Sequence, residues 1–120
     1  NSANSLNDLL KIRVFYFGTN LSDITALSYG GLNAHAQYLK SKPQAKLQIG
    51  GHTDERGTRE YNLALGERRA NAVARYLVGL GGQADQLNVV SHGKEKPAAD
   101  GSDEESWAKN RRVELDYTAQ

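Results

Sequence analysis

The chain of 120 residues contains no cysteine, which excludes disulfide bonds, thiol catalysis and zinc sites built on cysteine. This absence leaves the compartment open, because an oxidising compartment permits disulfides without requiring them. No apolar run approaches the roughly 20 residues that a transmembrane helix needs. The polar segment 1–5 (NSANS) has neither the basic region nor the apolar core of a signal peptide. We therefore expect the chain as given to be soluble.

The chain also lacks an excess of charge of one sign, since it contains 15 Lys and Arg residues and 14 Asp and Glu residues, for a net charge of +1. So small a net charge produces no strong field toward nucleic acid or an anionic membrane. Hydrophobic residues make up 38% of the chain and charged residues 24%, which is ordinary for a globular domain and excludes global disorder, collagen and coiled coil. The length corresponds to one domain.

Hydrophobic patterning predicts four strands separated by helices. The strands are expected at residues 13–17, 45–51, 87–91 and 112–117. The helices are expected from a cap at Ser22 or Asp23 to just before Pro43, from about 60 to 80, and after a cap within 100–105. This β-α-β-α-β-(short α)-β order predicts an α/β (α+β) domain with a mixed four-stranded sheet. We expect residues 1–12 to form a tail or short helix and residues 13–120 to form the domain.

The helix predicted at 60–80 has an arginine on its core-facing side. On a helical wheel centred on Val73, the apolar stripe within about 60° contains Gly66, Ala70, Leu77 and Leu80. Arg69 falls within this stripe, whereas Arg68 and Arg75 point roughly 140–160° away and should be solvated. A guanidinium directed toward a core keeps its charge, so Arg69 needs an acidic partner, an anionic ligand or a path to solvent.

Asp54 is the candidate partner of Arg69. It follows a predicted strand, in a polar loop that also contains Arg56, and strand ends of open α/β sheets are where ligand crevices form. An acid and an arginine around one small space suit a zwitterion, because the carboxylate accepts from an ammonium and the guanidinium binds a carboxylate. The alternative is a purely structural contact in which Asp54 caps the loop or pairs with Arg69.

Catalytic and metal-binding patterns are weak in this sequence. His52, His92 and Asp54 lack the spacing of a metal motif, and Ser91 has no nucleophile elbow around it. His35 is expected to be a partly buried structural histidine. Basic residues gather near the C-terminus, but acidic residues interleave with them, which predicts a solvated face: Lys94, Lys96, Lys109, Arg111 and Arg112.

Three segments together resemble the peptidoglycan-binding signature of the OmpA C-terminal-like family: residues 51–58 (GHTDERGT), 60–62 (EYN) and 65–73 (LGERRANAV). They fit the pattern T-D-x-x-G-x(4)-N-x(2)-L-x(3)-R-A-x(2)-V, and the resemblance extends over about residues 13–117. It implies an α/β two-layer sandwich with the helices on one face of the sheet. It also implies noncatalytic binding of the peptidoglycan stem peptide through diaminopimelate, without a cofactor or metal.

The resemblance implies a role for six residues. Asp54 and Arg69 match the acid and the arginine that hold the diaminopimelate ammonium and carboxylate, and Arg56 and Leu65 match further contacts. In the loop after the first strand, Thr19 and Asn20 stand where lipoprotein members of the family often have an aromatic residue and an aspartate. An amide at Asn20 keeps a hydrogen bond but loses a charge.

The resemblance also implies a place in the cell. Lipoprotein members are anchored to the outer membrane by a lipidated N-terminal cysteine, absent here, face the periplasm, and bind TolB, the β-propeller protein of the Tol system. We therefore expect a tether between outer membrane and cell wall in the Tol-Pal system, with no nucleic-acid partner. Two alternatives stay open: a module that chiefly binds a Tol-system protein, and a wall anchor of the OmpA or flagellar-stator type. A wall-processing enzyme is disfavoured, because no nucleophile-base or metal constellation accompanies the site.

Overall fold

A computed structural model describes residues 2–120, with side chains from residue 6 onward. Four strands form one sheet: β1 (Val14–Tyr16), β2 (Lys46–His52), β3 (Leu87–Gly93) and β4 (Arg112–Ala119). The α-helices are α1 (Ser2–Leu10), α2 (Tyr29–Ser41), α3 (Arg59–Gly79) and α4 (Glu104–Asn110), and the short 3₁₀ turns are Ala26–Ser28 and Ala84–Gln86. The predicted order of strands and helices is confirmed.

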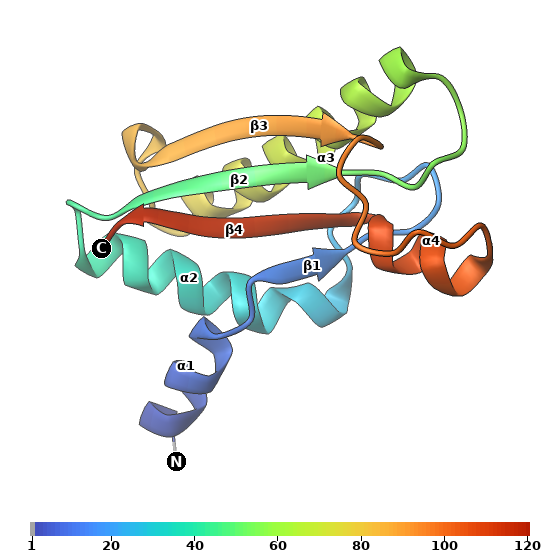
Figure 1. Ribbon diagram of the computed structural model, residues 1–120. Helices are drawn as coiled ribbons and strands as arrows, with labels where there is room; N and C mark the ends of the chain where they lie inside the picture. Colours follow the sequence, from blue (N-terminus) through green and yellow to red (C-terminus); the bar gives the residue numbers. More distant parts are fainter. Residues whose placement is uncertain (1) are drawn as a thin grey trace.

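The sheet is mixed, as predicted, with the strand order β1-β4-β2-β3 (Figure 1). β2 and β3 pair in parallel through the α3 crossover, whereas β4 runs antiparallel to both of its neighbours, β1 and β2. The last strand of the chain thus inserts between β1 and β2. As a result, the ends of β1 and β2 and the start of β4 meet at one end of the sheet.

The helices α2 and α3 cover one face of the sheet, and the core lies between them and the strands (Figure 1). The stripe predicted for the first helix is buried there, with Leu32, Ala36 and Leu39 at 1% exposure or less. Alternation along β2 buries Leu47 and Ile49 in the same core. The core therefore fixes α3 over the centre of the sheet.

The contact between α3 and β2 is made by two glycines. A Cβ atom added at Gly51 would lie 1.8 Å from the carbonyl oxygen of Gly66, and one added at Gly66 would lie 2.4 Å from Ser91 Oγ. Only residues without a side chain let the helix and strand backbones approach this closely. This approach sets the height of α3 above the end of β2.

Two predicted features of the helices are wrong. The helix α2 begins at Tyr29, after Ala26–Ser28, and not at a cap on Ser22 or Asp23. The carbonyls of Gly18 and Leu21 turn toward Arg69 instead, so this stretch of chain stays irregular. Leu80, predicted on the core-facing stripe, is 46% exposed. The helix α3 ends at Gly79, so Leu80 does not continue its buried face.

Candidate binding site

Arg69 of α3 is completely buried, at 0% exposure. Its guanidinium donates through Nε to the carbonyl of Leu21 at 2.8 Å, through Nη1 to that of His52 at 2.8 Å, and through Nη2 to that of Gly18 at 2.9 Å. It also lies over the ring of Phe17, 5.4 Å from the centroid. Burial lowers the pKa of Arg69 to about 10, so the side chain remains charged at neutral pH. Arg69 thus joins the loop after β1 to the end of β2.

Asp54 lies two residues beyond β2 and is 7% exposed. Its Oδ1 accepts from the backbone N–H of Arg56 at 3.0 Å and from Arg56 Nε at 3.2 Å, and its Oδ2 accepts from Arg56 Nη2 at 2.8 Å. Burial opposes ionisation of the carboxyl, but the hydrogen bonds and charge of Arg56, with the charge of Arg111, outweigh it and lower its pKa. Asp54 is therefore a carboxylate at neutral pH.

Of the structural alternative, the ion pair between Asp54 and Arg69 is not what forms, whereas Asp54 does cap its loop by accepting from the Arg56 N–H. Among the ion pairs of residues 6–120, those of Asp54 are to Arg56 and Arg111. Arg69 is instead satisfied by carbonyls, although the charge of Asp54 raises its pKa against the effect of burial. The acid and the arginine expected to form the site are thus brought to the same end of the sheet, each with its own partners.

Arg111 is the residue of this cluster that the sequence analysis did not assign to the site. It was placed with Arg112 on a solvated face, which is wrong: Arg111 is 8% and Arg112 4% exposed. Arg111 caps the C-terminus of α4 and donates through Nε to the carbonyl of Phe17 at 2.9 Å. Its side chain thereby reaches the loop after β1, and with Arg56 it is one of two guanidinium groups paired with Asp54.

Arg56 covers this cluster from the solvent side. Its guanidinium lies over the ring of Trp107, 4.0 Å from the centroid, while the Trp107 indole donates to Glu55 at 2.8 Å. The Arg56 side chain itself is 41% exposed. Arg56 was predicted as a site residue, but Trp107 and its stacking on Arg56 were not, because the two residues are far apart in the chain and no periodic pattern connects them.

Comparison with known proteins decides the family. Residues 16–111 match the OmpA family. The chain belongs to this family. It is 55% identical over 114 residues to the peptidoglycan-associated lipoprotein of Pseudomonas aeruginosa, which covers 92% of this chain and 67% of that protein. It is 54% identical over 102 residues to the peptidoglycan-associated lipoprotein of Haemophilus influenzae, covering 85% of this chain and 67% of the relative. The chain thus spans about two thirds of the length of these relatives.

Solved structures share the fold over most of the chain. The crystal structure of the peptidoglycan-associated lipoprotein from Burkholderia pseudomallei has a TM-score of 0.91 at 50% identity, covering 98% of this chain and 100% of that one. The C-terminal domain of Helicobacter pylori MotB, at 23% identity, has a TM-score of 0.81, covers 91% of this chain and 86% of that one, and shares the fold. These matches confirm the predicted fold class, and the family assignment supports the prediction that the domain is not an enzyme.

Three further residues that the resemblance implies as ligand contacts are Asn20, Thr19 and Leu65. Asn20 has a positive φ of 58° in the turn closed by Leu21 N–H and Gly18 O, and its Oδ1 accepts from the Tyr61 hydroxyl at 3.2 Å. Thr19, beside it, is exposed. Leu65 of α3 is 3% exposed, so only a small part of its side chain can contact a ligand. Their roles as ligand contacts stay predictions.

The imidazole rings of the histidines make contacts outside the arginine cluster, although the carbonyl of His52 accepts from Arg69. His35 is buried and bonds the Tyr117 hydroxyl and the Ile12 carbonyl, each at 2.7 Å, so its role is structural, as expected. The ring of His52 packs 5.0 Å from that of His92 in a hollow on the sheet face opposite the helices. Within residues 6–120, no group of three or more His, Asp or Glu side chains is placed to hold a metal ion.

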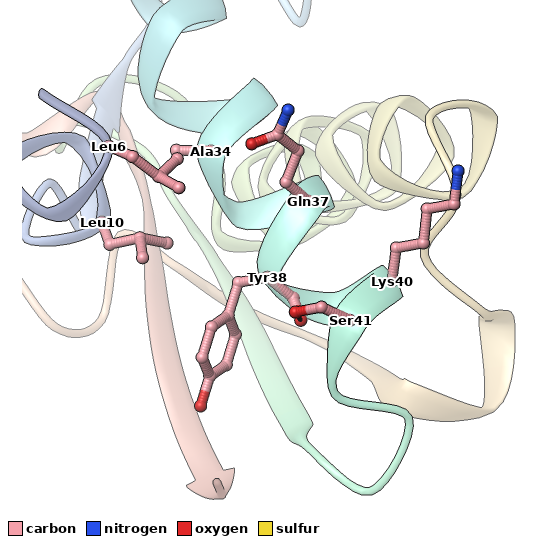
Figure 2. Close-up of a pocket in the computed structure, with 7 residues that line it drawn as sticks. All are labelled: Leu6, Leu10, Ala34, Gln37, Tyr38, Lys40 and Ser41. Carbon is pink, nitrogen blue, oxygen red and sulfur yellow. Dashed lines mark hydrogen bonds between the residues drawn. The ribbon is translucent and has the colours of Figure 1, made fainter. Parts of the chain in front are cut away.

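A separate groove lies between α1 and α2, where Leu6 and Leu10 lie beside Ala34 and Tyr38 (Figure 2). It contains none of the residues of the arginine cluster. Across the described residues, no helix is both long enough and apolar enough to cross a membrane.

Proposed function

We propose that this domain binds peptidoglycan noncovalently, through the diaminopimelate residue of the stem peptide. The observation that carries the proposal is the buried carboxylate of Asp54, paired with the guanidinium groups of Arg56 and Arg111, at the position of the family signature. Relatives more than half identical to this chain are named for their association with peptidoglycan. Diaminopimelate ends in an ammonium and a carboxylate on the same carbon, and a site with fixed charges of both signs complements that pair.

The ligand ammonium is received by Asp54. In the structure this carboxylate is held by Arg56, whose side chain is attached at its other end only by stacking on Trp107. Because Arg56 is partly solvated, it can give up its contact with Oδ2 when the ammonium arrives and still keep its backbone N–H bond to Oδ1. The exchange replaces one charge-assisted hydrogen bond of Asp54 by another, so the carboxylate stays paired while the ligand binds.

The role predicted for Arg69, direct pairing with the ligand carboxylate, remains part of the proposal. With three of its five N–H groups donated to carbonyls, Arg69 has two left for a ligand. Its bonds to Gly18 and Leu21 also fix the turn that presents Thr19 and Asn20. We propose that these two residues and Leu65 contact the peptide next to its charged end.

In the cell, such binding would tether the outer membrane to the wall. We propose a place at the periplasmic face of the outer membrane, as part of the Tol-Pal system, with TolB as a protein partner and a lipid anchor on a segment outside this chain. The relatives are themselves named lipoproteins, which supports this placement.

The test is co-sedimentation of the purified domain with purified sacculi, free of other proteins, for the wild type and for Asp54→Asn. A charge-assisted hydrogen bond is worth roughly 1.5–3 kcal/mol, so the variant should bind about ten- to a hundredfold more weakly. Asp85→Asn is the matched control, because Asp85 is an exposed acid in another part of the fold, on Ala84–Gln86. It should bind like the wild type.

Two results would contradict the proposal. If Asp54→Asn sediments with sacculi as well as Asp85→Asn does, the site is misplaced. If the wild-type domain does not sediment with sacculi at all, the alternative of a module that chiefly binds protein is preferred, with the acidic or C-terminal group of a partner occupying the cluster.

A further inference from the structure

A cleft of about 410 Å³ lies between α3 and the chain that leads into α2. One wall is formed by residues 22–24 and the other by one face of α3. The first wall is held in place, because Arg69 donates to the carbonyl of Leu21, directly before it. None of the side chains that pair with Asp54 lines the cleft. It is therefore a concave surface separate from the arginine cluster.

Two arginines of α3 line the cleft on either side of a small residue. Arg68 and Arg75 are seven residues apart, which places them on one face of the helix, about 10 Å from each other along its axis. Ala72 lies between them and leaves the space open. Both arginines are exposed, and neither forms an ion pair with any side chain that the structure describes, whereas Arg59 of the same helix pairs with Glu95. Two guanidinium groups are thus free to meet an acidic partner.

An aromatic surface adjoins the two arginines. Tyr29 and Tyr76, which both line the cleft, stack with their ring centroids 5.4 Å apart. The Tyr76 hydroxyl donates to Asn33 Oδ1 at 2.7 Å, which fixes the pair. Tyr29 remains 42% exposed, and Leu27, two residues earlier in the chain, is 99% exposed. A single exposed apolar residue is ordinary, but exposed tyrosine and arginine side chains around one cleft are typical of protein interfaces.

The charge of the cleft indicates the kind of partner. Of the described residues that line it, Arg68 and Arg75 are cationic and Asp23 is acidic, which leaves one positive charge in excess. Within the described residues, Asp23 pairs with neither arginine. Glu67, the neighbour of Arg68 in α3, does not line the cleft. A carboxylate that enters here meets a guanidinium fork, with which it can form two parallel hydrogen bonds.

We propose that this cleft docks an extended acidic segment of a partner protein. Two carboxylates of the segment pair with Arg68 and Arg75, and an apolar side chain between them packs on the tyrosine pair. In an extended chain, residues at i, i+2 and i+4 point to the same side, and i and i+4 are about 13 Å apart, a span that two flexible arginine side chains can match. A flat membrane surface fits less well, because the cleft is recessed between α3 and residues 22–24. The inference does not depend on the function proposed for the cluster around Asp54.

The test uses three peptides, acetylated and amidated at their ends, titrated into the domain and followed by heteronuclear NMR. They are Glu-Ala-Leu-Ala-Glu, its uncharged counterpart Gln-Ala-Leu-Ala-Gln, and Glu-Ala-Ser-Ala-Glu, which lacks the apolar side chain. The first should shift the amide resonances of Ala72 and Tyr76 in a saturable way. It should bind about tenfold more tightly than the second, because two ion pairs are lost there, and about threefold more tightly than the third. Added salt should weaken its binding.

Arg68→Gln and Arg75→Gln should each weaken the first peptide by about threefold and leave the second unchanged, since each removes one ion pair. Lys42→Gln is the matched control, because Lys42 is an exposed cation at the end of α2, outside the cleft. It should bind the first peptide like the wild type. All three side chains are exposed, so the variants should fold. Equal losses in all three would show that the peptide responds to net charge and not to the cleft.

Three other results would overturn the inference. The first is that Glu-Ala-Leu-Ala-Glu leaves the cleft resonances unchanged or binds no better than its glutamine counterpart. The second is that the domain ignores the peptides but binds vesicles of phosphatidylglycerol and phosphatidylethanolamine, and that Arg75→Gln abolishes this binding, which would assign the cleft to a membrane. The third is that Arg68→Gln reduces sedimentation with sacculi as strongly as Asp54→Asn does, which would make the cleft part of the peptidoglycan site.

Discussion

Gly51→Ala tests whether the close approach of α3 and β2 holds the site together. The added Cβ would lie 1.8 Å from the carbonyl oxygen and 2.5 Å from the carbonyl carbon of Gly66, both of which are backbone atoms. Ordinary contact begins at 3.4 Å, so strand and helix would have to separate by about 1.6 Å, the difference between the two distances. No rotation of a side chain can relieve such a clash, since both partners are main chain.

The loss of folding stability follows from the packing between α3 and β2 that this separation disturbs. Overpacking a core by one methyl group costs typically about 1–3 kcal/mol, and occasionally more. Here the shift also loosens Ala70 and Val73 of α3, which have no exposed surface. We therefore expect the free energy of unfolding to fall by about 3 kcal/mol or more, with a fall in Tm on the order of 10 °C.

Urea denaturation followed by circular dichroism measures this loss, and Gly79→Ala is the matched control. A Cβ at Gly79, the last residue of the same helix, meets nothing within 4 Å. Replacing glycine by alanine in a helix gains up to about 1 kcal/mol, and less at its end. If Gly51→Ala loses less than about 1 kcal/mol, the two backbones are not in the contact described.

Two further predictions concern binding and pH. Arg68→Ala and Arg75→Ala should each bind sacculi within about twofold of wild type, because both side chains are exposed on α3 and a surface charge contributes little; a loss as large as that of Asp54→Asn would contradict the orientation of the helix. Burial, helped by Arg112, lowers the pKa of His52 to about 4. Between that pH and the ordinary histidine pKa of about 6.5, His52 is protonated in the unfolded chain and neutral in the folded one. Stability should therefore fall between about pH 6.5 and pH 4, by at most about 3 kcal/mol, and a His52→Gln variant that shows the same loss in urea titrations would refute this assignment. The lowered pKa of Asp54 adds a loss only at lower pH, as that carboxylate is protonated.

The parts of the fold that could be predicted are those that a period in the sequence determines. Alternation along Lys46–His52 and Arg112–Ala119 gave two strands nearly to the residue, and the helical period gave α3 within one residue at each end. The start of α2 could not be predicted, because Ser22 and Asp23 are good caps locally. Arg69 instead donates hydrogen bonds to the carbonyls of Leu21 and Gly18, which lie 48 and 51 residues earlier in the chain, and these bonds keep that stretch irregular.

Like the fold, the site could be predicted only in part, namely where a residue departs from a periodic pattern. Arg69 stood out because a charge on an apolar helical stripe is an anomaly, and the burial of its side chain is confirmed. Arg111 gave no such signal, since it lies between a short helix and a strand, where no period applies. Its burial comes from Phe17, 94 residues earlier in the chain, whose carbonyl it bonds. A run of basic residues is normally solvated, and only the tertiary contact shows otherwise.

The buried arginines explain why fold and binding are coupled in this domain. Arg69 and Arg111 together donate to the carbonyls of Phe17, Gly18 and Leu21, so the loop after β1 is held by two guanidinium groups, of which that of Arg111 also contacts Asp54. Removing either guanidinium leaves buried carbonyls without donors, which costs stability in addition to any ligand contact. A loss of binding after truncation to alanine therefore cannot separate the two roles. Only a ligand pair that differs by one carboxylate can, because the fold is then the same on both sides of the comparison.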